Sequence, residues 1–310
     1  MGNFSKNSKQ DEYLYHYTKI DYLEKIFNDP NGKYVTLLLS EYHSLNDAEE
    51  GIYLYNFLRD YKDDIADLFE TDDEKKYCKM AIDDFFKGEN FKYLCERYYG
   101  KHFSFSLSEL GDSMQFWRQD YASENGIALR FNIDMYEEKN KNTSAYIPIE
   151  KIHYLGENTI KEVLLDDILL EFAKTVREEA DFVNHIKDVD DDGSPFYPMM
   201  GSSMLKYAPF WSVKNNVWES EKEYRMIKEI KSLTLSAKRR SNSKQDLPYE
   251  IGPDFKPRYR TIIQNPFDEI ILGPEIPDGY VGFIKEWLTQ KHYNVSVSQS
   301  HGRERRRLKI

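Results

Sequence analysis

The stretch YLYHYTKIDYLEKIF, residues 13–27, combines a strand pattern with a helix pattern. Its first half is a short aromatic run, which is typical of a β-strand. Its second half spaces its apolar residues as one face of a helix does, at Ile20, Leu23, Ile26 and Phe27. The sequence therefore predicts a strand that is followed at once by a helix, with a single imidazole inside the strand.

His16 is that imidazole, and Thr18 follows it two positions later. Successive side chains of a strand point to opposite faces, so His16 and Thr18 share one face. An imidazole and a hydroxyl on one face can hydrogen-bond the ribose of a nucleotide. The alternative is a core histidine whose ring is satisfied by a backbone carbonyl, and these residues alone leave both interpretations open.

The rest of the chain mixes strand and helix patterns without a steady βαβ alternation. Further strands are predicted at KYVTLLLS (33–40), HFSFSLSE (102–109), GIALRFNI (126–133) and YNVSVSQS (293–300). Such a mixture favours the α+β class over a doubly wound sheet. We expect a flexible arm at residues 1–12, a single domain over 13–300 with helical insertions near 60–100 and 157–200, and a basic tail at 301–310.

The composition is that of a globular protein. The chain has 310 residues, of which 40% are hydrophobic and 31% charged, so it can bury a full core. Its two cysteines, Cys78 and Cys95, lack CxxC spacing, which favours a reducing cytoplasm over a disulfide framework or a zinc site. We expect no metal. The sequence contains no apolar run of transmembrane length and its N-terminus lacks a signal-peptide pattern, so we expect a cytoplasmic protein without a membrane partner.

Common cofactor and catalytic signatures are missing from the sequence. There is no Walker phosphate loop, GxGxxG, HExxH or GxSxG. Any cofactor is therefore held by a less familiar arrangement of residues.

Two stretches place polar groups at the ends of predicted strands. In LLLSEYHSLNDAEE (37–50), Ser40 closes a buried strand, and Asn46 opens the next helix, where helix capping is an equally simple role. In FSFSLSE (103–109), the serines share one face of a strand, and buried hydroxyls need hydrogen-bonding partners. They are Ser104, Ser106 and Ser108.

Aromatic side chains follow in GDSMQFWRQDYAS (111–123). Trp117 and Tyr121 lie four residues apart, on one face of the predicted helix. Core packing is the simpler explanation of this pair, and a stacking site for a ligand is the alternative.

The stretch WESEKEYRMI (218–227) carries the strongest chemical pattern. Glu221, Glu223 and Arg225 alternate at the entrance of a predicted strand and therefore point the same way. Two neighbouring carboxylates can share acid, base and electrostatic roles, and each can raise the pKa of the other. An exposed edge strand with an ion pair to Arg225 is the alternative interpretation.

Taken in order, these stretches resemble a known family. The pattern LYHYT, LS…LND..E, FSLSE..DSMQFWRQDYA..NGIALRF, IHYL, W.SEKEYRMI and EIILGPEI is similar to that of bacterial and phage-associated proteins grouped as domain of unknown function 2971. The resemblance runs from about residue 13 to residue 300, and the stretches at 60–100 and 157–200 are its variable parts.

This family in turn resembles the ADP-ribosyltransferase superfamily, including DNA-modifying toxins of the DarT kind. The resemblance implies a split-sheet α+β core that holds NAD. It places His16 on the first strand, Ser40 or Tyr42 on the second, and Glu223 at the start of a late strand. The implied catalytic residues are Glu223 and Glu221, and the implied NAD-binding residues are His16, Tyr17, Thr18, Ser40, Tyr42, Asn46, Ser106, Trp117, Tyr121 and Arg225.

The implied activity is mono-ADP-ribosylation of a macromolecule, with NAD as the substrate. Cleavage of the bond to nicotinamide has an oxocarbenium-like transition state, which a carboxylate stabilises. The basic stretches KRRSNSK (238–244) and FKPRYR (255–260) favour a nucleic-acid acceptor, RNA or DNA, while the net charge of −11 favours a protein. A toxin or anti-phage role, with an antitoxin or chaperone partner, is expected from the resemblance. The alternatives are an NAD glycohydrolase and a non-catalytic nucleotide-sensing protein.

Overall fold

The structure is a computed structural model, and it describes the part of the chain that carries most of the predicted strands. The described residues are 13–41, 53–67, 69–72, 75–76, 78–79, 83, 102–118, 125–156, 212–229, 249–251 and 257–302. The predicted arm at residues 1–12, the predicted insertion near 157–200 and all but the first two residues of the predicted tail lie outside these ranges. Within them, no helix combines the length and the apolar character needed to cross a membrane.

The chain divides into two compact units. The first comprises Met1–Glu41, Phe103–Lys151 and Glu221–Ile310, and the second comprises Tyr42–His102 and Ile152–Ser220. Both predicted insertions fall in the sequence of the second unit, whereas the strand with His16 and the strand with Glu223 belong to the first.

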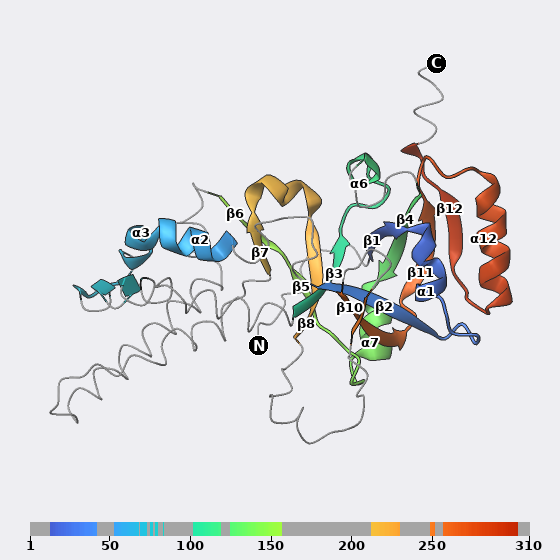
Figure 1. Cartoon of the computed structure of the whole chain (residues 1–310), viewed down its shortest axis with the longest axis horizontal. Helices are drawn as coiled ribbons and strands as arrows, with labels where there is room; N and C mark the ends of the chain where they lie inside the picture. Colours follow the sequence, from blue (N-terminus) through green and yellow to red (C-terminus); the bar gives the residue numbers. More distant parts are fainter. Residues whose placement is uncertain are drawn as a thin grey trace, which may run out of the picture. The chain divides into compact units, whose positions relative to one another are not determined.

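The first unit is built on a mixed ten-stranded sheet (Figure 1). Eight strands form a continuous path, in the order β12 (Ser296–Gln299), β11 (Phe267–Leu272), β4 (Gly126–Asn132), β1 (Tyr13–Lys19), β3 (His102–Ser108), β2 (Tyr34–Glu41), β10 (Pro257–Gln264) and β9 (Tyr249–Ile251). The remaining two are β8 (Glu223–Glu229), which pairs with β3, and β5 (Ile149–Lys151), which pairs with β8. Along this path β11 and β12 run parallel, whereas the other neighbouring strands, and the pair of β5 with β8, are antiparallel.

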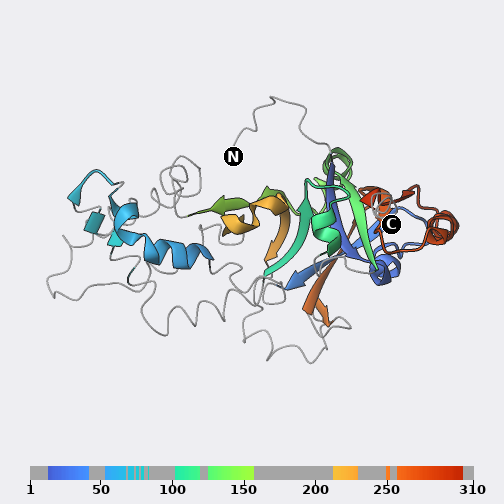
Figure 2. The ribbon, with the colours of Figure 1, turned by 90° about the horizontal axis from the view of Figure 1, so that it is seen from above.

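Strand β3 is the junction of this sheet, because it pairs with β1, β2 and β8. Its contact with β1 has a single register pair, Tyr15 with Ser108, whereas β1 pairs with β4 along its whole length. Its contact with β2 joins Ser104 to Ser40 at the other end of the strand. Figure 2 shows β1 and β4 lying side by side, with β3 next to them. The sheet therefore branches at β3.

Short helices accompany the sheet of the first unit. They are η1 (Ile20–Tyr22), α1 (Leu23–Ile26), α6 (Met114–Arg118), α7 (Ile133–Asn140) and α12 (Gly279–Gln290). The predicted helix after the first strand is thus divided into one 3-10 turn and one α-helical turn. Asn132 begins α7, because its side-chain oxygen accepts a hydrogen bond from the backbone N–H of Met135.

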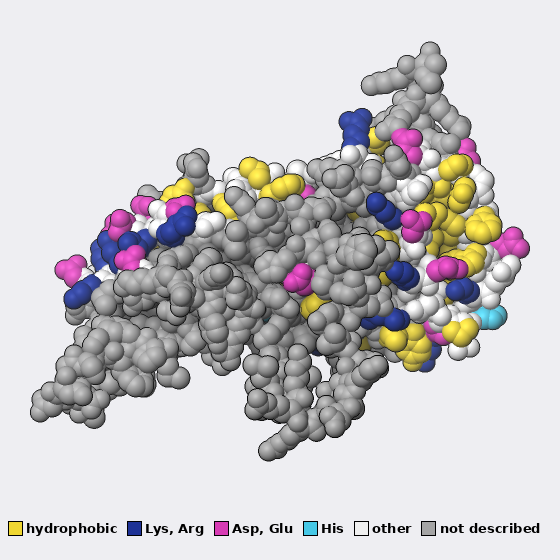
Figure 3. Space-filling model, viewed as in Figure 1, with side chains coloured by type: hydrophobic (Ala, Val, Ile, Leu, Met, Phe, Trp, Pro, Cys, Tyr) yellow, Lys and Arg dark blue, Asp and Glu magenta, His cyan; other side chains and the backbone are white. Residues whose placement is uncertain are grey.

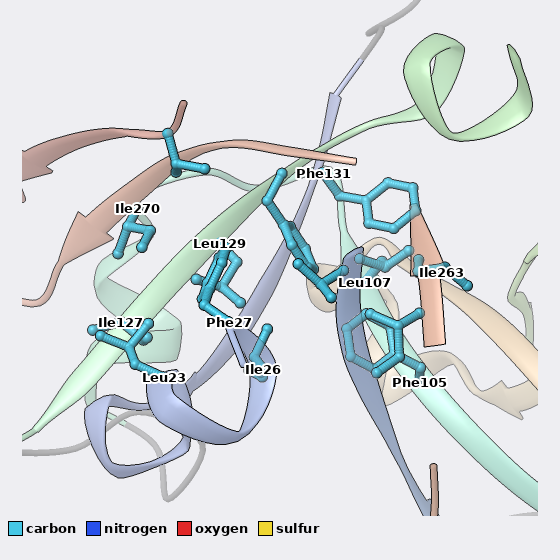
Figure 4. Close-up of a cluster of buried hydrophobic side chains, with 14 of the residues drawn as sticks. Leu23, Ile26, Phe27, Phe105, Leu107, Ile127, Leu129, Phe131, Ile263 and Ile270 are labelled. Atoms are coloured by element: carbon cyan, nitrogen blue, oxygen red, sulfur yellow. The ribbon is translucent and has the colours of Figure 1, made fainter. Parts of the chain in front are cut away.

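The main core of the first unit lies on one face of the sheet (Figure 4). Alternation decides which strand residues enter it: every second residue of β3 is buried there, namely Phe103, Phe105 and Leu107. Strand β4 contributes Ile127, Leu129 and Phe131 in the same way, and α1 adds Leu23 and Ile26. A smaller cluster, Trp117 with Ala128 and Ile271, lies on the opposite face.

The second unit contains helices α2 (Tyr53–Asp60) and α3 (Lys62–Ala66), and a parallel pair of strands, β6 (His153–Leu155) and β7 (Val213–Asn215). The hydroxyl of Tyr53 donates a hydrogen bond of 2.8 Å to the carbonyl of Leu155, which joins α2 to β6. The 3-10 segment η5 (Asn216–Glu221) leads from β7 toward β8.

The described residues are consistent with the predicted α+β class, since a largely antiparallel sheet is accompanied by a few short helices. The strand-like stretch IEKIHYLG (149–156) is not one continuous strand. It contains two strands, β5 and β6, which belong to different sheets and meet at the buried residue Ile152.

Replacing Leu129 by alanine tests the core directly. Leu129 is fully buried in the centre of β4, so Leu129→Ala should lower the free energy of unfolding by about 2–5 kcal/mol. Ile262→Ala is the control, because Ile262 is 59% exposed and should change stability by about 0.5 kcal/mol or less. Urea unfolding of both variants measures the difference, and equal effects would contradict this core.

Candidate functional site

The candidate site is the face of β3 and β8 that lies opposite the main core. Tyr224 and Met226 of β8 contact the main core, so Glu223 and Arg225 project from the other face. The serines of β3 alternate with its core phenylalanines and project from that same face. The register pair Tyr15 and Ser108 agrees with this assignment, because Tyr15 packs against the smaller cluster of that face.

Glu223 and Arg225 form a buried bidentate ion pair on this face. The Nε atom of Arg225 lies 2.7 Å from Oε1 of Glu223, and the Nη2 atom lies 2.8 Å from Oε2. Glu223 is only 6% exposed and Arg225 only 3%. The predicted ion pair therefore exists, but it is enclosed by protein and does not lie on an exposed edge. In such surroundings an electrostatic interaction is stronger than at the surface.

Glu221 is buried immediately before β8, at 3% exposure. Its backbone carbonyl accepts a hydrogen bond of 2.6 Å from the Oγ atom of Ser108, which in turn accepts one of 3.0 Å from the N–H of Leu110. The carbonyl of the next residue, Lys222, accepts a 3.2 Å bond from the N–H of Glu109. The end of β3 therefore holds the backbone just before the carboxylate of Glu223.

The serines of β3 differ in their surroundings. Ser108 is fully bonded, as just described. The Oγ atom of Ser104 is buried and has no hydrogen-bonding partner among the described residues. Ser40 of β2 is the register partner of Ser104, so their side chains lie next to each other on one face. Ser106 is half-buried, and its carbonyl oxygen contacts the ring of His16.

His16 is bonded within the protein through one of its ring nitrogens. Its Nδ1 atom lies 2.9 Å from the carbonyl oxygen of Ser106, and its ring stacks on Phe105 with centroids 3.9 Å apart. Burial lowers the pKa of His16 to about 4, against the smaller opposing effect of the bond to Ser106. The ring is therefore neutral at pH 7. Since a carbonyl can only accept, Nδ1 carries the proton, and Nε2 is the acceptor of the ring.

The two residues on which the prediction depends do not share a face. The register partner of His16 is Leu129, a residue of the main core, and the ring of His16 packs on Phe105 of that core. Glu223 projects from the opposite face. Both strands pair with β3, but the described contacts do not bring imidazole and carboxylate together. The role of His16 as an NAD contact stays a prediction.

Tyr17 and Trp117 are accounted for by packing and hydrogen bonds. The hydroxyl of Tyr17 donates to the carbonyl of Leu110 at 2.8 Å and accepts from the N–H of Ser113 at 2.9 Å. Its ring stacks on Phe116, and burial raises the pKa of its hydroxyl. Trp117 is 4% exposed, and its Nε1–H donates to Asp112 at 2.9 Å. These contacts fix α6 against the sheet.

The other predicted site residues are only partly placed. Thr18 lies near the end of β1, half-buried, on the same face as His16. Tyr42, Asn46 and Tyr121 lie outside the described residues. Among the described residues, no three His, Cys, Asp or Glu side chains are grouped closely enough to hold a metal ion.

One feature of the site could not be read from the sequence. Lys222 has a φ of 45°, in the left-handed region, and it separates the two glutamates. A lysine gives no signal of such a conformation, because glycine and asparagine are the usual residues there. The glutamates were identified by their spacing, but the turn that presents them depends on contacts with β3, far away in the sequence.

Comparison with known proteins gives one match. Residues 116–226 match the model of a family described as a protein of unknown function, DUF2971. The matched range begins in α6 and ends in β8, so it includes Glu221, Glu223 and Arg225. This match supports the predicted resemblance to that family over these residues. No curated protein and no solved structure matches the chain.

The buried imidazole predicts a specific pH dependence of stability. The pKa of His16 is about 4 in the folded protein, below its usual value of 6.5, so between these values the unfolded chain binds a proton that the folded chain does not. The contribution of neutral His16 to the free energy of unfolding is complete above pH 6.5 and decreases as the pH falls toward 4. Between pH 7 and pH 5 this contribution should decrease by about 2 kcal/mol.

Urea unfolding at pH 7 and pH 5 measures this contribution. The loss of stability between the two values should be about 2 kcal/mol smaller for His16→Gln than for the wild type. The variant His301→Gln is the control, because His301 is exposed. An identical pH dependence for wild type and His16→Gln would show that the ring is not held neutral.

Removing the guanidinium tests the buried ion pair. Arg225→Gln deprives both oxygens of Glu223 of their charged partner in a site closed to water, and should lower the free energy of unfolding by about 3–5 kcal/mol. The control Arg59→Gln removes an exposed ion pair with Asp60 and should cost about 1 kcal/mol or less. Similar effects of the two substitutions would contradict the burial of the pair.

Proposed function

We propose that this protein is an NAD-dependent mono-ADP-ribosyltransferase in which Glu223 supplies the catalytic carboxylate. The observation that carries the proposal is the buried carboxylate of Glu223 at the first residue of β8, held bidentately by Arg225 on a face lined with serine hydroxyls. One of these hydroxyls, that of Ser104, is buried without a partner among the described residues. Buried charged groups and unsatisfied hydroxyls of this kind are typical of sites that act on a ligand.

The chemistry requires a negative charge of this kind. When the bond between nicotinamide and ribose breaks, positive charge develops on the ribose ring, as in glycoside cleavage. A fixed carboxylate stabilises that charge, and it does so most strongly where water is excluded. Glu223 satisfies both conditions. A carboxylate oxygen can accept more than one hydrogen bond, and in the proposed complex a ribose hydroxyl of NAD donates to Glu223.

The neighbouring groups suit the remaining parts of NAD. Arg225 is a planar cation that can pair with an oxygen of the diphosphate, and the hydroxyls of Ser40 and Ser106 can bond to ribose or phosphate. Glu221 is the second carboxylate and can orient or deprotonate the acceptor. His16 contributes separately: Nε2 is a neutral acceptor for a hydroxyl, on the other face of the sheet.

The arrangement of strands also supports the proposal. The resemblance stated from the sequence implies a split sheet, with the glutamate at the start of a late strand. In the first unit the sheet branches at β3, and β8 begins with Glu223. We therefore propose that this unit contains an ADP-ribosyltransferase-like core with helical insertions.

For the acceptor we propose nucleic acid, RNA or DNA, over protein. On the first unit, Arg258 and Lys25 each lie 5.3 Å from the ring of Tyr22, which combines cations with an aromatic surface. Such combinations hold single-stranded nucleic acid by phosphate contacts and base stacking. Figure 3 shows Lys and Arg interspersed with Asp and Glu on the described part of the molecular surface in that view. Nucleic acid would therefore contact a local patch and not a broad basic surface. A toxin or anti-phage role in the cytoplasm, with an antitoxin or chaperone partner, belongs to the same proposal.

One observation favours a second function, nucleotide binding without chemistry. Both carboxylate oxygens of Glu223 are already bonded to Arg225, and His16 does not share their face. A protein that senses NAD would need neither group to be free. Binding of NAD without release of nicotinamide would select this second function.

The test is incubation of the purified protein with NAD labelled in its adenosine part, in separate mixtures with RNA, single-stranded DNA and lysate protein. Nicotinamide release and label in one acceptor pool are expected for the wild type. Glu223→Gln should lower the rate by about 10²–10³-fold, because it removes the charge but keeps the shape.

The matched control is Glu219→Gln, an exposed glutamate four residues earlier. It should keep the wild-type rate. Free ADP-ribose with no labelled acceptor would indicate a glycohydrolase using the same site. Equal rates for wild type and Glu223→Gln would refute the role of Glu223 and with it the proposed mechanism.

A further inference from the structure

Lys222 joins the two glutamates of the site in an unusual backbone conformation. Its φ of 45° lies in the left-handed region, which residues with a Cβ atom disfavour. Such a residue persists only where its surroundings hold it, and strained residues of this kind gather at functional sites. In this structure the residue comes directly before the carboxylate that the proposed reaction uses.

The end of β3 supplies the contacts that hold this turn. The Oγ–H of Ser108 donates to the carbonyl of Glu221 at 2.6 Å, and the N–H of Glu109 donates to the carbonyl of Lys222 at 3.2 Å. Two successive carbonyls are therefore fixed by two successive residues, the last residue of β3 and the one that follows it. Ser108 is 3% exposed, and it also accepts from the N–H of Leu110, so its rotamer is fixed.

A second set of contacts holds the other side of the same turn. The hydroxyl of Tyr224 donates to Oε1 of Glu109 at 2.7 Å, and Nζ of Lys151 lies 3.6 Å from the same oxygen. The backbone N–H of Glu109 thus bonds to Lys222, the residue before Glu223, and its side chain bonds to Tyr224, the residue after it. Glu223 lies between these two attachment points in the sequence, and its carboxylate is held by Arg225.

We propose that Ser108 and the left-handed Lys222 form a positioning device that fixes the direction of the Glu223 carboxylate; this inference rests on the proposed function. Ser108 acts through the backbone of residues 221 and 222, not by touching the substrate. The Lys222 side chain takes no part, because only the conformation of its backbone is required. A small displacement of a catalytic group can reduce a rate about 100-fold, so the device should affect turnover more than binding.

Steady-state release of nicotinamide from NAD separates these effects. Ser108→Ala should lower kcat by about 10–100-fold while the KM for NAD stays within about twofold. The control is Ser296→Ala on β12, which removes a similar hydroxyl-to-carbonyl bond, to Asp268, and should leave kcat unchanged. A simple loss of stability would instead lower the amount of active enzyme, which thermal unfolding of each variant measures.

Substitutions of Lys222 distinguish its backbone from its side chain. Lys222→Gly should keep kcat within about twofold of wild type, because glycine adopts the left-handed conformation readily. Lys222→Ile should lower kcat as Ser108→Ala does, since a β-branched residue strongly disfavours that conformation. In the double variant Ser108→Ala with Lys222→Gly, kcat should be about threefold or more above that of Ser108→Ala alone. Glycine adopts the left-handed conformation without strain, so the turn keeps its shape without the hydrogen bond from Ser108.

Two results would overturn the inference. If Glu223→Gln loses turnover but Ser108→Ala and Lys222→Ile keep it, the carboxylate is catalytic and needs no such device. If Lys222→Gly loses as much activity as Lys222→Ile, the side chain and not the backbone is required. Full activity of Glu223→Gln, or no nicotinamide release by the wild type, would instead refute the proposed function, and the positioning role would fall with it.

Discussion

The end of β3, Ser108 together with the next residue Glu109, is the constraint on which the site depends. Ser108 pairs with Tyr15 of β1, and its hydroxyl donates to the carbonyl of Glu221, while the N–H of Glu109 donates to the carbonyl of Lys222. The segment Ser108–Glu109 therefore contacts both β1 and the two residues that precede β8. Without it, the buried carboxylate of Glu223 would have no defined position relative to the rest of the sheet.

This constraint explains how a buried ion pair can be maintained beside a hydrophobic core. Taking Glu223 and Arg225 out of water is unfavourable, and the cost is offset only when their geometry is good. The bidentate contact provides that geometry, and the rigid strand beneath it prevents the pair from relaxing toward solvent. The same rigidity is useful for catalysis, because a group that is already oriented needs no reorganisation when charge develops on a substrate. Structure and proposed function thus depend on the same few hydrogen bonds.

Much of the strand architecture could be predicted from local patterns. The aromatic run at His16, the alternating serines of β3 and the spacing of Glu223 and Arg225 all gave strands where strands occur, whereas Glu221 lies in the 3-10 segment η5 and not in the predicted strand. Alternation also indicated which side chains share a face within one strand. It could not indicate how faces match between strands, because that depends on long-range register. For this reason local patterns could not show that His16 and Glu223, which the resemblance assigns to one NAD, project from opposite faces of the sheet.

The central claim is that a nicotinamide ribose binds against the carboxylate of Glu223. A crystal structure of the Glu223→Gln variant with NAD tests it most directly, since this substitution should slow cleavage and preserve binding. We expect the nicotinamide ribose within hydrogen-bonding distance of residue 223, on the face with Arg225 and the serines of β3. NAD bound elsewhere on the molecule, or turned with its adenine toward residue 223, would contradict it.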